Sequence, residues 1–288
     1  MTTGQLFSVA WSPDPSVLGG GVALIVAYFA WLRRVAALRA LAFLAGVAVL
    51  MVALVSPIDR IGELYLFSAH MVQHLLLILV APPLMLYGLP PAATRRLLRV
   101  PGVDRLERLV GRPRVTLPLK IGALWLWHLP FLYDLALRFD GVHALEHLVF
   151  IVTATMFWWP VLTPLEERRL APPTAMIYLF TAMAAIALLG IVITLAPTPL
   201  YAFYANPPDP YGALGLVRDG WGLSVLADQQ IGGLLMWVAG GVFYIITILT
   251  EFGLWFAEPE TDEETTAGAT RTSAMSRNAA GRSLEGAR

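Results

Sequence analysis

Seven apolar runs, each of about 20 residues, constrain the fold of this 288-residue chain more than any other feature. A helix of about 20 residues crosses roughly 30 Å of bilayer hydrocarbon. Inside lipid, a chain must satisfy its backbone hydrogen bonds within helices or a closed barrel. Only 14% of the residues are charged, whereas soluble domains carry about 25%. We therefore predict an all-α, polytopic membrane helix bundle with about seven transmembrane helices.

The predicted spans follow these runs, and the first is short and rich in glycine. Pro82 and Pro83 fall inside the third span and predict a kink there, because proline lacks the N–H group that continues a helix. The seven predicted spans are Val17–Leu32, Leu38–Ser56, Leu64–Leu89, Val115–Leu137, Val142–Leu162, Thr174–Leu195 and Leu226–Phe256.

The basic residues are distributed unevenly between the connections, which predicts the orientation. Three flank the first connection, two lie in the fifth and four lie in the C-terminal tail, whereas the opposite side has only Arg60, Arg138 and Arg218. Cytoplasmic loops are enriched in lysine and arginine, so we expect the N-terminus outside and the C-terminus in the cytoplasm. The third connection holds the largest group: Arg95, Arg96, Arg99, Arg105, Arg108, Arg112, Arg114 and Lys120.

The segments between and after the spans have distinct compositions. Pro91–Arg114 is too polar to span and predicts a short basic helix on the inner surface, attracted by anionic lipid. Residues 258–288 lack apolar periodicity and predict a disordered cytoplasmic tail, leaving residues 1–257 as a seven-helix transmembrane domain. Ala196–Gly222, rich in Pro, Tyr and Gly, predicts an ordered, irregular lid over the outer face. We expect no removable signal peptide.

Several classes of function are disfavoured by what the sequence lacks. The absence of cysteine excludes disulfides, thiolate metal sites and cysteine nucleophiles. A net charge of zero gives no basic surface for nucleic acid. No nucleotide-binding loop, nucleophile elbow or paired catalytic carboxylate motif is present, so we expect a protein that is not an enzyme.

All five histidines fall at one level, in the outer part of their predicted spans, and none lies in the tail. Two pairs are separated by four residues, and such pairs present both imidazoles on one helix face, where they can chelate one metal ion. Polar residues at membrane depth are costly and therefore indicate function. The predicted site consists of His70, His74, His128, His143 and His147.

Further groups near this level extend the predicted metal site. Asp228 opens the seventh span and could bind the metal or orient a histidine through its second ring nitrogen. Met71 and Met236 could add thioether sulfur, which favours copper(I). Imidazole suits copper, zinc, iron and nickel, so the histidines alone do not identify the metal.

Three interpretations of the histidine layer remain open at this point: a metal or haem site, a proton or ion path, and structural hydrogen bonds between helices. A bis-histidine haem would use one residue from each of two facing helices, such as His74 and His147, and leave their i, i+4 partners surplus. We expect no span to carry a buried lysine or a run of carboxylates through its middle, which argues against a proton or ion path.

Four long motifs resemble those of a known family. HMVQHLLLILVAPPLMLYGLP (70–90), WHLPFLYDLAL (127–137), HALEHLVF (143–150) and DQQIGGLLMWVAGG (228–241) are similar to the signatures of the CtaG family. These are multi-span bacterial membrane proteins linked to assembly of caa-type cytochrome c oxidase, distinct from the single-span copper chaperones that share the name. The resemblance covers residues 15–257, and the motif histidines and Asp228 are all present.

The resemblance implies a multi-pass protein of the bacterial inner membrane that assists oxidase biogenesis and is not itself an oxidase subunit. It implies copper as the metal, and oxidase subunits, above all subunit II, and other assembly factors as partners. The predicted outer position of the histidines agrees, because the copper centre of subunit II is metallated outside. The histidine spacing alone does not separate copper from zinc or haem.

Overall fold

The structure is a computed structural model and describes residues 1–32 and 35–257, so the predicted tail lies outside the described residues. Every regular element in this part of the chain is a helix, as predicted. The elements are α1 (Thr3–Val9), α2 (Pro15–Trp31), α3 (Ala37–Val55), α4 (Pro57–Leu64), α5 (Phe67–Leu75), η1 (Leu76–Val80), α6 (Ala81–Gly88), α7 (Pro91–Leu98), α8 (Val103–Val110), α9 (Pro113–Trp127), α10 (Pro130–Arg138), α11 (Asp140–Leu162), η2 (Glu166–Arg168), α12 (Pro172–Thr194), η3 (Ala202–Ala205), η4 (Leu216–Gly220), α13 (Val225–Leu234), η5 (Leu235–Ala239) and α14 (Gly240–Ala257).

Five helices in the described residues are long and apolar enough to cross a membrane, and a sixth span results if the bent pair α9–α10 counts as one. The five are α3, the continuous run α5–η1–α6, α11, α12 and the continuous run α13–η5–α14. The first predicted span corresponds to α2, an apolar helix of 17 residues. The chain is thus a helical protein with several candidate membrane spans, and its orientation stays a prediction.

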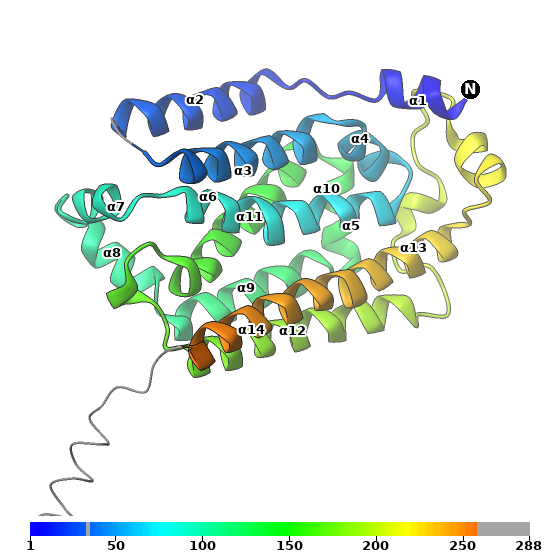
Figure 1. Ribbon diagram of the computed structural model, residues 1–288. Coiled ribbons are helices and arrows are strands. Elements are labelled where there is room, and N and C mark those ends of the chain that lie inside the picture. Colours follow the sequence, from blue (N-terminus) through cyan, green and yellow to red (C-terminus); the bar gives the residue numbers. More distant parts are fainter. Residues whose placement is uncertain (33–34, 258–288) are drawn as a thin grey trace, which may run out of the picture.

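The long helices lie side by side, and the connections gather at two ends (Figure 1). We call the end that carries α1, α4 and residues 196–224 the histidine end, because α5 and α11 bring their histidines towards it. The opposite end carries α7 and α8, whose exposed arginines give it the name arginine end. The sequence predicts that the histidine end faces outwards.

Proline begins many of these helices. Pro15, Pro57, Pro113 and Pro172 each stand at the first turn of a helix, where the missing N–H would have had no partner. At α2 the Asp14 carboxylate completes the start by accepting hydrogen bonds from the next backbone N–H groups. The residues at which these helices begin are therefore determined by the local sequence.

The paired prolines of the third predicted span produce a π-helical turn within one continuous helix. The turn η1 directly precedes α6, whose second residue, Pro82, cannot donate a hydrogen bond to the carbonyl of Ile78. The indole Nε1 of Trp158 on α11 donates to that carbonyl instead, at 2.9 Å. A neighbouring helix thus satisfies the carbonyl that proline frees, as membrane helices require.

The fourth predicted span, by contrast, is broken. Helices α9 and α10 meet at an angle of 74°. Leu129 precedes Pro130 and adopts an extended conformation (φ −64°, ψ 128°), because the proline ring disfavours helical geometry in the residue before it. The prediction of one helix over Val115–Leu137 is therefore wrong. The break falls directly after His128.

The segment between α12 and α13 is ordered and irregular, with two short helical turns, as predicted. Its Tyr201 and Tyr204 are 1% exposed and belong to the main core. Tyr204 donates a hydrogen bond to the carbonyl of Gly62 at 2.7 Å, which joins the segment to α4. These contacts make it a fixed cover at the histidine end.

Candidate metal centre

Five buried histidines converge inside the histidine end of the bundle. His70 and His74 lie on α5, His143 and His147 lie on α11, and His128 ends α9. Their exposed fractions run from 0% for His70 to 7% for His143 and His147. The structure therefore brings together the five histidines that the sequence placed at one level.

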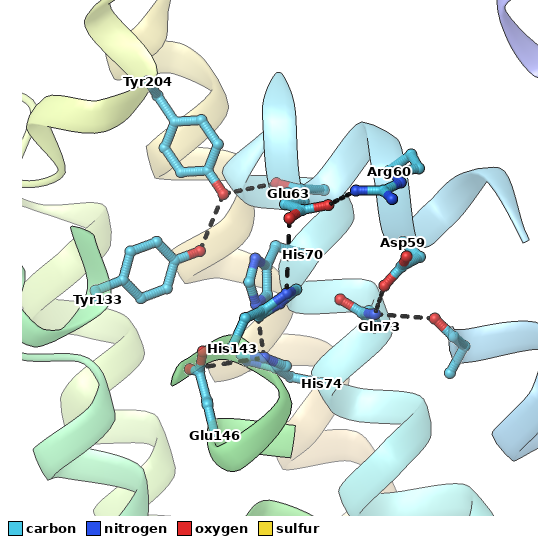
Figure 2. Close-up of polar contacts among 12 residues, drawn as sticks. Asp59, Arg60, Glu63, His70, Gln73, His74, Tyr133, His143, Glu146 and Tyr204 are labelled. Carbon is cyan, nitrogen blue, oxygen red and sulfur yellow. Dashed lines mark hydrogen bonds and ion pairs between the residues drawn. The ribbon is translucent and has the colours of Figure 1, made fainter. Parts of the chain in front are cut away.

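The spacing of four residues on α5 places two imidazoles in direct contact. The Nε2 atoms of His70 and His74 lie 2.7 Å apart (Figure 2). The corresponding pair on α11, His143 and His147, has ring centroids 4.2 Å apart. Between the two helices, the rings of His70 and His143 lie 5.2 Å apart and those of His74 and His147 5.5 Å apart. Four imidazoles therefore face one another across the α5–α11 interface.

Close backbone contact positions the first of these residues. A Cβ atom at Gly62 would lie 2.8 Å from the backbone nitrogen of His70, so only glycine allows α4 to approach α5 this closely. On the other side, the tyrosines cover the ring. Tyr133 packs at 5.3 Å from His70 between ring centroids, and its hydroxyl lies 3.1 Å from that of Tyr204. His70 is held between α4 and this tyrosine pair.

Glu146 lies among the histidines and is fully buried. Its exposed fraction is 0%, and its Oε1 lies 3.8 Å from Nε2 of His74 (Figure 2). Neither carboxylate oxygen has a hydrogen-bond partner. A buried carboxylate without a partner is costly unless a cation neutralises it. Glu146 therefore adds two acceptor atoms without partners to the cluster, and a bound cation would stabilise its ionised form.

The imidazoles also carry unpaired atoms. One ring nitrogen on each of the five histidines is buried and lacks a hydrogen-bond partner. Buried polar atoms in native proteins are nearly always paired, so this concentration needs an explanation. Two overlapping groups could each hold a metal ion, with ligand atoms within 4.8 Å of one another: His70, His74 and His147, and His70, His143 and Glu146. The donor set fits a transition metal that accepts imidazole and carboxylate ligands.

His128 stands slightly apart from these two groups. Its Nδ1 lies 2.7 Å from the carbonyl of Leu124, which fixes the ring, and its Nε2 is buried and unpaired. Its ring centroid lies 6.1 Å from that of His74. The helix break at Pro130 leaves His128 at the end of α9, where it faces the cluster as a fifth donor beyond the closest set.

Asp228 makes hydrogen bonds that the sequence did not predict. Its Oδ2 accepts a hydrogen bond from the backbone N–H of Phe67 at 2.7 Å, and its Oδ1 accepts from both the N–H and the hydroxyl of Ser68. It therefore caps the start of α5, the helix that carries His70 and His74. Asp228 belongs to neither three-residue group and supports the cluster by anchoring its helix.

Met71, suggested from the sequence as a sulfur donor, is fully buried and packs against Gly232 on α13. A Cβ at Gly232 would meet the side chains of Phe67 and Met71. Met236 is likewise buried in the main core. The packing of Met71 accounts for its position without a metal.

A polar network lies beside the cluster on α4. Gln73 on α5 donates from Nε2 to the carbonyl of Ala53 at 2.9 Å and to Oδ1 of Asp59 at 2.7 Å. Arg60 donates to Glu63 at 2.6 Å, and Oε1 of Glu63 lies 4.0 Å from Nδ1 of His143. Burial raises the pKa of Asp59 to about 6 and also raises the pKa of Glu63. Both carboxyls ionise less readily than exposed ones.

Lys120 contradicts one prediction. It lies inside α9, its side chain is 1% exposed, and its Nζ has no hydrogen-bond partner. The sequence placed it with the arginines of the third connection and predicted that no span carries a buried lysine. Its Nζ lies 6.0 Å from the centroid of the Phe150 ring, which packs against His74. This finding removes one argument against a proton or ion path.

Sequence reasoning missed several residues of this region because their partners come from distant segments. The tyrosines, Asp59 and Glu63 carry no local motif, and only Glu146, between two histidines in HALEH, had a local signal. That signal is the position of Glu146 between His143 and His147 on α11.

A family model described as cytochrome c oxidase caa3 assembly factor (Caa3_CtaG) matches residues 23–258. This chain belongs to that family. The match confirms the resemblance inferred from the motifs, and it includes all five histidines, Glu63 and Glu146. No solved structure matches this member of the caa3 assembly factor family.

Curated relatives of this caa3 assembly factor family member come from mycobacteria. An uncharacterised protein of Mycobacterium bovis is 26% identical over 269 residues, which cover 85% of this chain and 39% of the relative. An uncharacterised protein of Mycobacterium tuberculosis has the same identity and coverage. One from Mycobacterium leprae is 24% identical over 86% of this chain and 40% of the relative. The chain thus spans about two fifths of the length of these relatives.

Proposed function

We propose that this chain is an assembly factor for a caa3-type cytochrome c oxidase that holds copper in the histidine cluster and transfers it to the oxidase. On this proposal the protein is a metal carrier of the bacterial inner membrane, not an enzyme. Its partners are the lipid bilayer, oxidase subunits, above all subunit II, and other assembly factors. The family membership supports the assembly role.

The single observation that carries the metal-holding part is the group of unpaired buried atoms. One nitrogen of each histidine and both oxygens of Glu146 lack partners. Four of these histidines and Glu146 form two overlapping groups that could each hold a metal ion. Copper accepts imidazole nitrogen readily, and it is the metal that an oxidase copper centre needs. The ion is cargo here, so a site that can also release it is required.

A haem in the same place is less well supported. A macrocycle between His74 and His147 would have to displace the surrounding rings, because His70 and Phe150 pack at 4.1 and 4.8 Å from His74. A porphyrin is wider than these gaps. The crowded rings suit a small ion better.

The test is to purify the protein in detergent from copper-supplemented cells, measure bound metals by mass spectrometry and record an absorption spectrum of the same sample. We expect near-stoichiometric copper and no Soret band. His74→Ala should lose the copper, whereas Val72→Ala, a truncation two residues away on the same helix, should keep it. Equal copper in wild type and His74→Ala would overturn the proposal, and a Soret band with little copper would support haem instead.

A further inference from the structure

A cavity of about 290 Å³ opens beside the histidine cluster, between α2, α4 and α11. Its lining is unusual for a protein so poor in charge, because carboxylates from three separate segments meet there. Two histidines of the cluster form part of the same wall. The polar lining residues on which the argument rests are Asp14, Asp59, Glu63, Asp140, His143 and His147.

Acidic residues outnumber basic ones in the lining of this cavity. Four carboxylates line it, and Arg60 is the basic residue among its lining. Clefts lined by one sign of charge concentrate counter-ions and speed their association. Most of the remaining lining is apolar, and a weakly polarisable wall strengthens such fields. The larger apolar lining residues are Val17, Leu54, Leu148 and Ile151. The cavity is therefore suited to attract a metal cation.

The carboxylates are arranged by depth. Asp14 and Asp140 are exposed and stand at the rim, at the starts of α2 and α11. Asp59 and Glu63 are only 8% and 7% exposed and lie further in, on α4. A cation that enters from the solvent would thus meet exposed carboxylates first and buried ones next.

One of the two buried carboxylates adjoins the cluster. Oε1 of Glu63 lies 4.0 Å from Nδ1 of His143 (Figure 2). His143 and His147 are each only 7% exposed and line the cavity, and the Nε2 atom of each is unpaired. These buried, unpaired nitrogens are a second sign, independent of the acidic residues, that the cavity leads to a cation site.

We propose that this acidic cavity is the port through which the metal cation enters and leaves the histidine cluster, with Glu63 passing it to His143. The inference rests on the proposed function and deepens it by naming the route. On the predicted orientation, the port opens on the outer side of the membrane, where the recipient would collect the ion.

The transfer is a ligand exchange without a change of oxidation state. Arg60 leaves Glu63, the cation binds a carboxylate oxygen of Glu63, and this metal–oxygen bond then breaks as a metal–nitrogen bond to His143 forms. The imidazole of His143 is neutral, so its nitrogen lone pair can bind the metal without first losing a proton. Once the cation has passed, Arg60 can restore its ion pair with Glu63.

The experiment follows the loading of metal-free protein in detergent with Cu²⁺ by stopped-flow quenching of tryptophan fluorescence, since Trp127 adjoins His128 and the chain has nine tryptophans. The rim variant Asp14→Asn/Asp140→Asn should fold normally, because asparagine can replace Asp14 as the cap of α2 and α11 has Phe139, not Asp140, at its cap position. Glu63→Gln tests the inner step. Asp219→Asn is the matched control, because it removes an exposed carboxylate of the covering segment, outside the cavity lining.

We expect the rim variant to load about tenfold more slowly than wild type at low salt, with the difference disappearing at high salt. Glu63→Gln should load more slowly at both salt concentrations, with the same final copper content. Asp219→Asn should behave as wild type. Unchanged rates in both cavity variants would overturn the port alone, as would a lowered final content in Glu63→Gln, which would place Glu63 in the holding site. Failure of wild type to bind copper would overturn the proposed function as well.

Discussion

Polar side chains at the two ends of the bundle differ in whether they have hydrogen-bond or ion-pair partners. At the arginine end, polar groups find partners near the surface: Arg168 bonds to Asp104 and Glu107, and the indole of Trp159 donates to Glu107 at 2.8 Å. At the histidine end, the cluster is buried and many of its polar atoms have no partner. The arginine end has the paired polar groups of a structural surface. The histidine end has the unpaired groups of a site that awaits a ligand.

Several polar side chains in the interior near the arginine end are also hydrogen-bonded. The rings of Phe157 and Tyr178 stack at 4.7 Å, and the Tyr178 hydroxyl donates to the carbonyl of Phe157 at 3.0 Å. Thr116 lies 2.7 Å from the same hydroxyl. Lys120 and Tyr244 are exceptions among the described residues, since the Lys120 amine and the Tyr244 hydroxyl are buried without hydrogen-bond partners. Most of the unpaired groups nevertheless lie in the cluster at the histidine end.

The largest expected effect is on copper affinity at Glu146, and it tests the contrast between the two ends. Glu146→Gln removes the buried carboxyl group, and we expect copper affinity to fall about 10–100-fold, the usual cost of losing a group that supports a metal site. The metal-free protein should be as stable as wild type or more so, because an unpaired buried carboxylate is unfavourable. Chelator competition measures the affinity, and thermal unfolding in the same detergent measures the stability.

The matched control is Glu251→Gln, which changes a partly buried carboxylate on α14. It should leave the copper affinity unchanged. If Glu146→Gln kept full affinity and lost stability instead, the carboxylate would be a structural group, and the contrast between the two ends would fail.

An intermediate effect on stability alone is expected at Trp158. Trp158→Phe removes the donor to the Ile78 carbonyl and leaves a buried acceptor unsatisfied, which costs about 1–3 kcal/mol. Trp159→Phe is the natural comparison, because its indole donates to a carboxylate near the surface that water can also serve. Thermal unfolding should rank Trp158→Phe well below Trp159→Phe, with equal copper content in both. A similar loss in the two variants would refute the assigned role of Trp158.

The sequence was sufficient for most of the long apolar helices and for the grouping of the histidines, and physical reasons explain both. Apolar runs long enough to span a bilayer specify helices, because lipid offers no other partner to the backbone. His70 and His74 meet because spacing of four residues on a helix is a local property. The family resemblance rested on long motifs and was confirmed by the family match.

Tertiary contacts explain what the sequence did not predict. Asp228 looked like a ligand because of its level in the chain, but only the folded structure shows it at the start of α5. Lys120 was grouped with neighbouring arginines, although α9 turns it inwards. The angle between α9 and α10 depends on Pro130, whose effect as a kink or a full break cannot be read from one segment. Glu63 meets His143 across 80 residues of chain.

The smallest effect is expected at the arginine end, from Arg168→Gln. Arg168 joins η2 to α8 through Asp104 at 2.7 Å and through Glu107, yet Arg168 and Asp104 are partly exposed, and ion pairs near water contribute little. Hydrogen bonding from Arg168 lowers the pKa of Asp104 below its usual value. The pair therefore stabilises the fold above the ordinary pKa of aspartate, and this contribution is lost as the pH falls and Asp104 becomes protonated.

Thermal unfolding of Arg168→Gln and wild type should accordingly differ slightly at neutral pH and low salt. The difference should shrink in high salt, because screening weakens exposed pairs, and it should disappear in acid. Copper content and loading rate should match wild type under all these conditions, since Arg168 lies at the end opposite the cluster. A loss of copper in this variant would show that the two ends are coupled, and the division of the bundle into a structural end and a metal-holding end would then be wrong.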